Sequence, residues 1–159
     1  MALNRGKQFE YKISEDIQKC FGDKCFWIRL NDQMSGYKTV SQNLCDFILF
    51  NIDKLILIEA KSCKGNTFPL TNLSQYEKLK YKVGIPGVRA GVFLWFIEHK
   101  RVAYVPISTI TKLKEDGKKS VNVKMLDSNE YNIKVIPSIT KRVFPDCDYS
   151  ILMELQDGE

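Results

Sequence analysis

Residues 46–61 read DFILFNIDKLILIEAK, and this stretch decides the fold. It holds two short apolar runs, Asp46–Phe50 and Leu55–Ala60, joined by Asn-Ile-Asp-Lys at residues 51–54. Two short apolar runs separated by a turn are typical of a β-hairpin. We therefore predict a buried hairpin in a central sheet, and any charged side chain on it needs an explanation.

Three charged side chains stand at one end of this hairpin. With a turn centred on Ile52-Asp53, Asp46 lies directly opposite Glu59, with the two Cα atoms ~4.5–5.5 Å apart. Side chains alternate between the two faces of a strand, and Glu59 and Lys61 therefore point the same way. Like charges placed opposite each other destabilise a sheet, so the pair needs a compensating charge.

A divalent cation is one such compensation. The two carboxylates and the Ala60 carbonyl form the set of hard oxygen atoms that suits Mg²⁺, and Lys61 beside them could orient and polarise an attacking water. The alternative is structural, with Asp46 ending a strand and Glu59 and Lys61 forming the hydrated edge of a sheet. The apolar neighbours favour the functional interpretation, because unpaired charges are costly in a buried hairpin.

A third acid precedes the hairpin in the chain. Apolar residues that recur every four positions predict a helix over residues 4–22, namely Phe9, Ile13, Ile17 and Phe21. Glu10 lies at the edge of this apolar face, from which it could reach Asp46 and Glu59 at the end of the sheet. The alternative is a first-turn acid that complements the helix dipole.

The remaining sequence predicts a single domain over residues 1–159. Periodicity and turn signals predict strands over 24–30, 90–97 and 102–105, and helices over 74–82, 108–114 and 148–155. Ser74-Gln75-Tyr76-Glu77 has the capping-box pattern and would open the helix over 74–82. Residues 31–43 are polar and predict a short arm. The order of elements indicates an α/β fold, with helices flanking a central mixed β-sheet.

Composition limits the class of protein. The 159 residues are 44% hydrophobic and 27% charged with a formal net charge of +5, which is typical of a globular domain rather than a disordered chain. Five cysteines without a C-x-x-C pair indicate reduced thiols, and a lone histidine, His99, argues against zinc and against a Ser-His-Asp triad. We expect a cytoplasmic protein, since no apolar run approaches the ~20 residues of a membrane span and the N-terminus lacks a signal peptide's apolar segment.

The hairpin pattern D-x₁₂-E-A-K, preceded by a helix with Glu10, resembles the PD-(D/E)-x-K nuclease superfamily. The resemblance is closer to the RecU-type Holliday junction resolvases of Gram-positive bacteria and their phages. Further segments extend it over nearly the whole chain, namely Arg5-Gly6-Lys7-Gln8-Phe9-Glu10, Phe68-Pro69-Leu70 with Asn72, Gly117-Lys118-Lys119-Ser120 and Asp148-Tyr149.

This resemblance implies a restriction-endonuclease-like core and a Mg²⁺-dependent endonuclease that resolves four-way junctions in DNA recombination and repair, with Mn²⁺ as a substitute metal. It implies that Asp46 and Glu59 are metal ligands, that Lys61 is the catalytic lysine and that Glu10 is a supporting catalytic acid. The alternatives are a restriction-like or repair nuclease that acts on duplex or flap DNA, and a DNA-binding module that does not cut.

The chain departs from the family in two places. The family's glutamine in the helix after F-P-L aligns with Glu77, while Gln75, two residues earlier, is a possible supporting residue. The family's long stalk is represented only by the short arm over residues 31–43.

The expected partners are branched DNA and a second copy of the chain. The candidate DNA-binding residues are Tyr37 and Lys38 in the arm, and Lys64, Lys78, Lys118 and Lys119 elsewhere; the alternative for each lysine is a solvated surface. A homodimer would match the two-fold symmetry of a junction that needs two cuts. The aromatic residues that we expect to leave apolar surface for this contact are Trp27, Phe93, Trp95 and Phe96.

Overall fold

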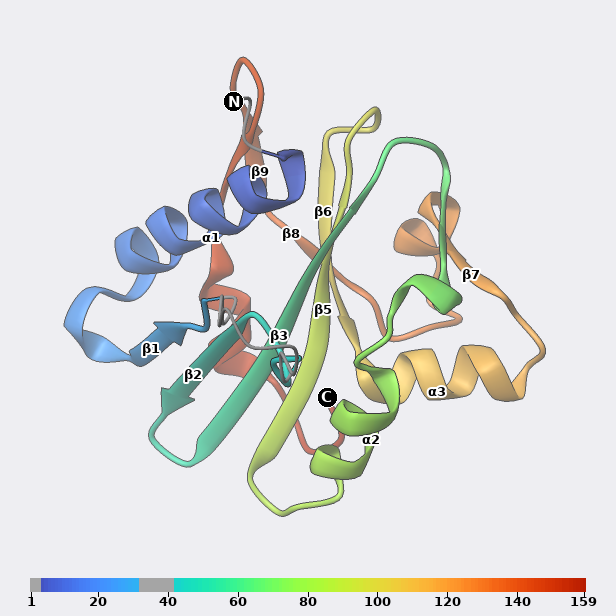
Figure 1. The fold of residues 1–159 in the computed structure, drawn as a ribbon, viewed down its shortest axis with the longest axis horizontal. Coiled ribbons are helices and arrows are strands. Elements are labelled where there is room, and N and C mark those ends of the chain that lie inside the picture. Colours follow the sequence, from blue (N-terminus) through green and yellow to red (C-terminus); the bar gives the residue numbers. More distant parts are fainter. Residues whose placement is uncertain (1–3, 32–41) are drawn as a thin grey trace, which may run out of the picture.

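A six-stranded mixed sheet organises the chain in the computed structural model, which describes residues 4–31 and 42–159 (Figure 1). The strands follow the order β1 (Phe26–Arg29), β2 (Phe47–Asn51), β3 (Lys54–Cys63), β5 (Val88–Phe96), β6 (Arg101–Pro106) and β8 (Lys134–Ile136). Neighbours pair antiparallel except β3 and β5, which run parallel. A parallel pair needs a crossover connection, and here that connection carries β4 and α2 over one face of the sheet.

Helices cover both faces of this sheet. Helix α1 (Arg5–Phe21) packs on one face together with the 3₁₀ helix Tyr149–Glu154, while α2 (Tyr76–Val83) and α3 (Ile107–Glu115) pack on the other. Two short pairs complete the fold, β4 (Thr67–Pro69) with β7 (Ser120–Asn122), and β9 (Ser138–Thr140) with β10 (Pro145–Cys147). The expected α/β architecture with a mixed sheet flanked by helices is confirmed.

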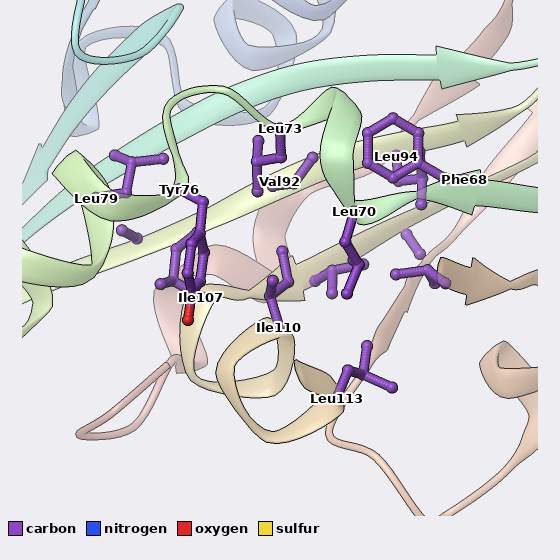
Figure 2. Packing of buried hydrophobic residues seen from close by; sticks show 14 of the residues in the cluster. Phe68, Leu70, Leu73, Tyr76, Leu79, Val92, Leu94, Ile107, Ile110 and Leu113 are labelled. Carbon is purple, nitrogen blue, oxygen red and sulfur yellow. The ribbon is translucent and has the colours of Figure 1, made fainter. Parts of the chain in front are cut away.

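Alternation along β3 divides its side chains between two apolar clusters. Ile56 and Ile58 face the cluster under α1, whereas Leu55 and Leu57 face the cluster under α2 and α3, which is shown in Figure 2. Glu59 and Lys61 continue the Leu55–Leu57 series and therefore point to the α2 face. The start of α2 and the end of the hairpin thus meet on one side of the sheet.

Three local predictions need correction. The helix predicted over 74–82 begins at Tyr76, and it has no capping box, because Gln75 is the N-cap and the Ser74 hydroxyl bonds the Gln75 side chain instead. The C-terminal helix predicted over 148–155 is a 3₁₀ helix. Phe93, Trp95 and Phe96 are wholly buried because β5 has helices on both of its faces, so they offer no surface for a second copy.

Among the described residues, no helix is long and apolar enough to cross a membrane. The five cysteines are all free thiols, and three of them, Cys25, Cys45 and Cys147, are buried. His99 lies in the exposed turn between β5 and β6, where its Nε2 is 2.6 Å from Asn66 Oδ1.

Gly91 on β5 provides a test of the sheet packing, because a Cβ atom there would overlap the Tyr104 ring from β6. Overpacking of a dense core typically costs about 1–3 kcal/mol. We predict that Gly91→Ala lowers the free energy of unfolding by that amount in urea denaturation. Gly65→Ala is the matched control, since nothing lies within 4 Å of its Cβ position; equal stabilities for the two variants would contradict the packing described here.

Candidate metal and phosphate site

The predicted register of the β2–β3 hairpin is confirmed. Phe47 pairs with Ile58 and Asn51 with Lys54, and the Asp46 backbone N–H donates to the Ile58 carbonyl at 3.0 Å. Asp46 directly precedes β2, and continuing this register by one residue places it opposite Glu59. Two carboxylates meet here because the turn length of the hairpin leaves no other register for them.

Both carboxylates are held in place by β3. The Ala60 N–H donates to Asp46 Oδ2 at 2.8 Å, and Lys61 Nζ lies 2.8 Å from Glu59 Oε1. The other oxygen, Glu59 Oε2, is buried and has no hydrogen-bond partner in the part of the chain that the structure describes. An ionised oxygen in that position is incompletely compensated, which favours an added cation.

A cavity of about 230 Å³ brings the predicted site residues together. Its lining consists of Glu10, Gln42, Asn43, Cys45, Asp46, Glu59, Ala60, Lys61 and Gln75. A larger cavity of about 600 Å³ lies between α3 and residues 126–133 and contains none of these side chains. The sequence-predicted acids, the lysine and Gln75 thus share one polar cavity although they come from four separate segments.

Glu10 reaches this cavity from the second turn of α1. The helix begins at Arg5, so the alternative of a first-turn acid is wrong. Its Oε2 lies 2.6 Å from Arg29 Nη2 of β1, and its charge contributes to raising the pKa of Asp46. Arg29, which does not line the cavity but holds Glu10, was missed by sequence reasoning; a charged residue at the end of an otherwise apolar strand was the available signal.

Burial and the neighbouring negative charges raise the pKa of both carboxyl groups. Burial raises the pKa of Glu59 to about 7, and the neighbouring Asp46 charge adds to this while Lys61 opposes it. Burial also raises the pKa of Asp46, although the hydrogen bond from Ala60 opposes the shift. A bound cation would reverse both effects, because it favours the charged form of each carboxyl group.

The donor set fits a hard divalent cation. Asp46 and Glu59 supply carboxylate oxygens, and the Ala60 carbonyl points to the same sheet edge as its N–H because both groups of a strand residue face one side. Within the described residues, no group of three or more His, Cys, Asp or Glu side chains forms a ready-made cluster. Mg²⁺ commonly uses one or two protein carboxylates and completes its shell with water and phosphate oxygens, so the two acids present are sufficient.

The helix after F-P-L contributes Gln75 rather than Glu77. Gln75 is buried and lines the cavity, whereas Glu77 is exposed and lies at a separate apolar cleft beside Leu44. Phe68 and Leu70 have a structural role, since both insert into the cluster beneath α2 (Figure 2) and so anchor the segment that leads to Gln75.

The predicted DNA-binding lysines do not line the cavity. Lys64, Lys78, Lys118 and Lys119 are all exposed and lie outside its lining. Tyr37 and Lys38, together with most of the predicted arm, lie outside the described residues, and their role stays a prediction.

Comparison with known proteins places these residues in a family context. A family model described as RecU, Recombination protein U, matches residues 29–142, which is more than two thirds of the chain. The match spans Asp46, Glu59, Lys61 and Gln75. No curated protein matches the chain. The chain also resembles a solved structure of Archaeoglobus fulgidus Hjc, a Holliday junction resolvase from an archaeal hyperthermophile, with 22% identity over 81% of this chain and 86% of that chain and a TM-score of 0.47.

The raised pKa of Glu59 predicts how the stability of the metal-free protein depends on pH. The folded state keeps the Glu59 proton up to a pKa of about 7, whereas the unfolded chain releases it near the ordinary value of 4.5. The contribution of protonated Glu59 to the free energy of unfolding is therefore fully present below pH 4.5 and is lost as the pH rises toward 7. We predict that Glu59→Gln flattens this fall in urea titrations with a chelator present; an unchanged slope would contradict the burial of an ionisable Glu59.

Proposed function

This chain belongs to the RecU family, and from that membership and the cavity geometry we propose that Asp46 and Glu59 are metal ligands and Lys61 a catalytic lysine. The chain is a nuclease that acts on Holliday junctions, and it depends on a metal ion as nucleases of this family do. Its core is the restriction-endonuclease-like one that the sequence predicted. The observation that carries the residue assignment is the convergence of two acids and a lysine in one polar cavity.

The metal that we propose is Mg²⁺, with Mn²⁺ as a substitute, because the donors are hard oxygen atoms. When bound, such an ion supplies positive charge that stabilises the charge developing on the scissile phosphate. Asp46 is pre-positioned for this role because the Ala60 N–H fixes one of its oxygens at 2.8 Å. Glu59 offers its unpaired Oε2, and Glu10 supports the site from α1.

Lys61 orients the attacking water. Its ammonium group lies 2.8 Å from Glu59 and is partly exposed to the cavity, so it can also donate a hydrogen bond to a water placed there. The water oxygen bonds to phosphorus as the bond from phosphorus to the 3′ oxygen breaks; the water gives up a proton and the departing oxygen takes one up, which leaves a 5′-phosphate and a 3′-hydroxyl. A preorganised cation near this developing charge is a large contribution to catalysis.

The substrate we propose is the four-way junction, held by the phosphate-binding lysines Lys64, Lys78, Lys118 and Lys119. The remaining alternatives are tested by incubating the protein with an immobile junction, a matched duplex and a flap, with and without Mg²⁺. Preferential cutting of the junction supports this proposal. Preferential cutting of duplex or flap indicates a restriction-like or repair nuclease, and binding without cutting indicates an architectural module.

We propose that the enzyme is a homodimer whose contact includes the apolar surface of β1 and β2. Phe26 pairs with Phe50 across these strands and Ile28 with Ile48, and Phe26 is 64% exposed. In the part of the chain that the structure describes, α2 packs over β5 rather than over β1 and β2. We propose a second copy of the chain as the partner that covers this surface, because a two-fold dimer presents two equivalent active sites to a two-fold junction.

Neutralising either proposed metal ligand should abolish cutting. We predict that Asp46→Asn and Glu59→Gln each lower the junction cleavage rate by at least ~100-fold, because both charges hold the metal. Junction binding in gel-shift assays should stay intact or tighten, since binding depends mainly on lysines and suffers from carboxylate repulsion. Asp53→Asn, an exposed change at the turn of the same hairpin, is the control; near wild-type cutting by Asp46→Asn would end the assignment.

Replacing Lys61 should lower the cleavage rate without destabilising the fold. We predict that Lys61→Met lowers the cleavage rate by roughly 100-fold or more while circular dichroism and thermal unfolding stay close to wild type. The matched control is Lys54→Met at the other end of β3. An unfolded or fully active Lys61→Met protein would show that the lysine has a structural role or none.

The dimer proposal predicts that wild-type protein sediments as twice its monomer mass at micromolar concentration. Phe26→Ser should shift it toward monomer, because it removes apolar area from the contact. Ile139→Ser, an equally exposed apolar change on the β9–β10 hairpin, should not. Monomeric wild-type protein in analytical ultracentrifugation would contradict the proposal.

A further inference from the structure

Three side chains at the rim of the catalytic cavity form a chain of hydrogen bonds. Gln42 Nε2 donates to Ser74 Oγ at 3.0 Å, and the Ser74 hydroxyl donates to Gln75 Oε1 at 3.0 Å. Gln42 and Gln75 both line the cavity that contains Asp46 and Glu59. Ser74 connects them and lies in the turn that precedes α2.

The donors and acceptors in this series of three hydrogen-bonded side chains fix the orientation of the Gln75 carboxamide. A hydroxyl group has one proton to donate, and the Gln42 amide nitrogen can only donate. The Ser74 proton is therefore directed to Gln75 Oε1. Because Ser74 engages the oxygen of Gln75, the amide nitrogen is the group of Gln75 that is left to donate to a ligand in the cavity that Gln75 lines.

The backbone of Ser74 and Gln75 is fixed by its neighbours on both sides. Leu73 and Tyr76, on either side of Ser74-Gln75, are both buried in the apolar cluster (Figure 2). The Gln75 carbonyl accepts the Leu79 N–H at 3.0 Å in the first turn of α2. Only rotation about the side-chain bonds of Gln75 is left, and the Ser74 hydroxyl restricts it.

We propose that Ser74, supported by Gln42, is a positioning residue that holds the NH₂ group of Gln75 toward the scissile phosphate; this inference rests on the proposed function. The other polar donors of the cavity are engaged within the protein, since Lys61 is paired with Glu59, Gln42 donates to Ser74 and Asn43 donates to the Asn31 carbonyl. The Gln75 amide is a neutral donor for a phosphate oxygen whose charge grows in the transition state. A rotated amide would turn its own oxygen toward that charge and repel it.

The kinetic test is a double-mutant cycle on junction cleavage. Loss of one oriented hydrogen bond predicts that Ser74→Ala lowers kcat about tenfold with KM nearly unchanged, while Ser74→Thr, which keeps the hydroxyl, retains most of the rate. On a Gln75→Ala background, Ser74→Ala should have no further effect, because the two act as one unit. Thr71→Ala, which removes an exposed hydroxyl three residues earlier, is the control. Additive effects of Ser74→Ala and Gln75→Ala would overturn the proposal.

A second measurement does not require DNA cleavage, so it tests the positioning role of Ser74 separately from the proposed nuclease function. In metal-free protein, the heteronuclear NOE of the Gln75 side-chain ¹⁵N should be high in wild type and in Ser74→Thr, and low in Ser74→Ala. Gln42→Ala should lower it less, because Ser74 can still donate. An NOE that Ser74→Ala leaves unchanged overturns the positioning role, whereas a wild-type protein that cuts no junction contradicts the proposed function instead.

Discussion

The structure depends on one electrostatic constraint, which is the placement of two carboxylates opposite each other at the end of a buried hairpin. Asp46 and Glu59 meet because the β2–β3 register leaves no alternative, and their burial raises the pKa of both. Apolar residues on both faces of β3 stabilise a hairpin that its charged end disfavours. A cation bound between these two carboxylates would therefore stabilise the folded state.

The rest of the fold brings further groups to that end of the sheet. The parallel β3–β5 pair requires a crossover, and its return helix α2 begins beside Glu59, so Gln75 enters the same cavity. From the opposite face, α1 extends Glu10 to the cavity and ties it to Arg29. The acids, the lysine and the amide come from separate elements, and sheet topology alone makes them neighbours.

Much of this arrangement could be predicted from the sequence because it depends on short-range rules. The hairpin turn determines the pairing of Asp46 with Glu59, and helical periodicity places Glu10 at the edge of the apolar face. Other features depend on tertiary contacts that no local pattern contains. Ser74-Gln75-Tyr76-Glu77 matches a capping box, yet the packing of Tyr76 starts the helix later and frees Ser74 to bond Gln75.

The burial of β5 was missed for a similar reason. Its aromatic residues suggested an exposed apolar edge, but all nine residues of the strand are buried because helices cover both faces and strands flank both sides. A continuous apolar run of this kind is typical of a central strand with a parallel neighbour. The edge strands β1 and β2 do carry exposed apolar residues, since Phe26 pairs with Phe50 and both side chains are exposed.

The most direct test of the central claim is thermal unfolding at pH 7 during a Mg²⁺ titration, repeated with Mn²⁺. A ligand that binds only the folded state raises the unfolding midpoint as its concentration exceeds Kd, by about 2.7 kcal/mol of stability at a hundredfold excess. We predict a concentration-dependent rise for the wild-type protein and none for Asp46→Asn. A wild-type midpoint that does not respond to either ion, or an equal rise in the variant, would contradict a metal site built on Asp46 and Glu59.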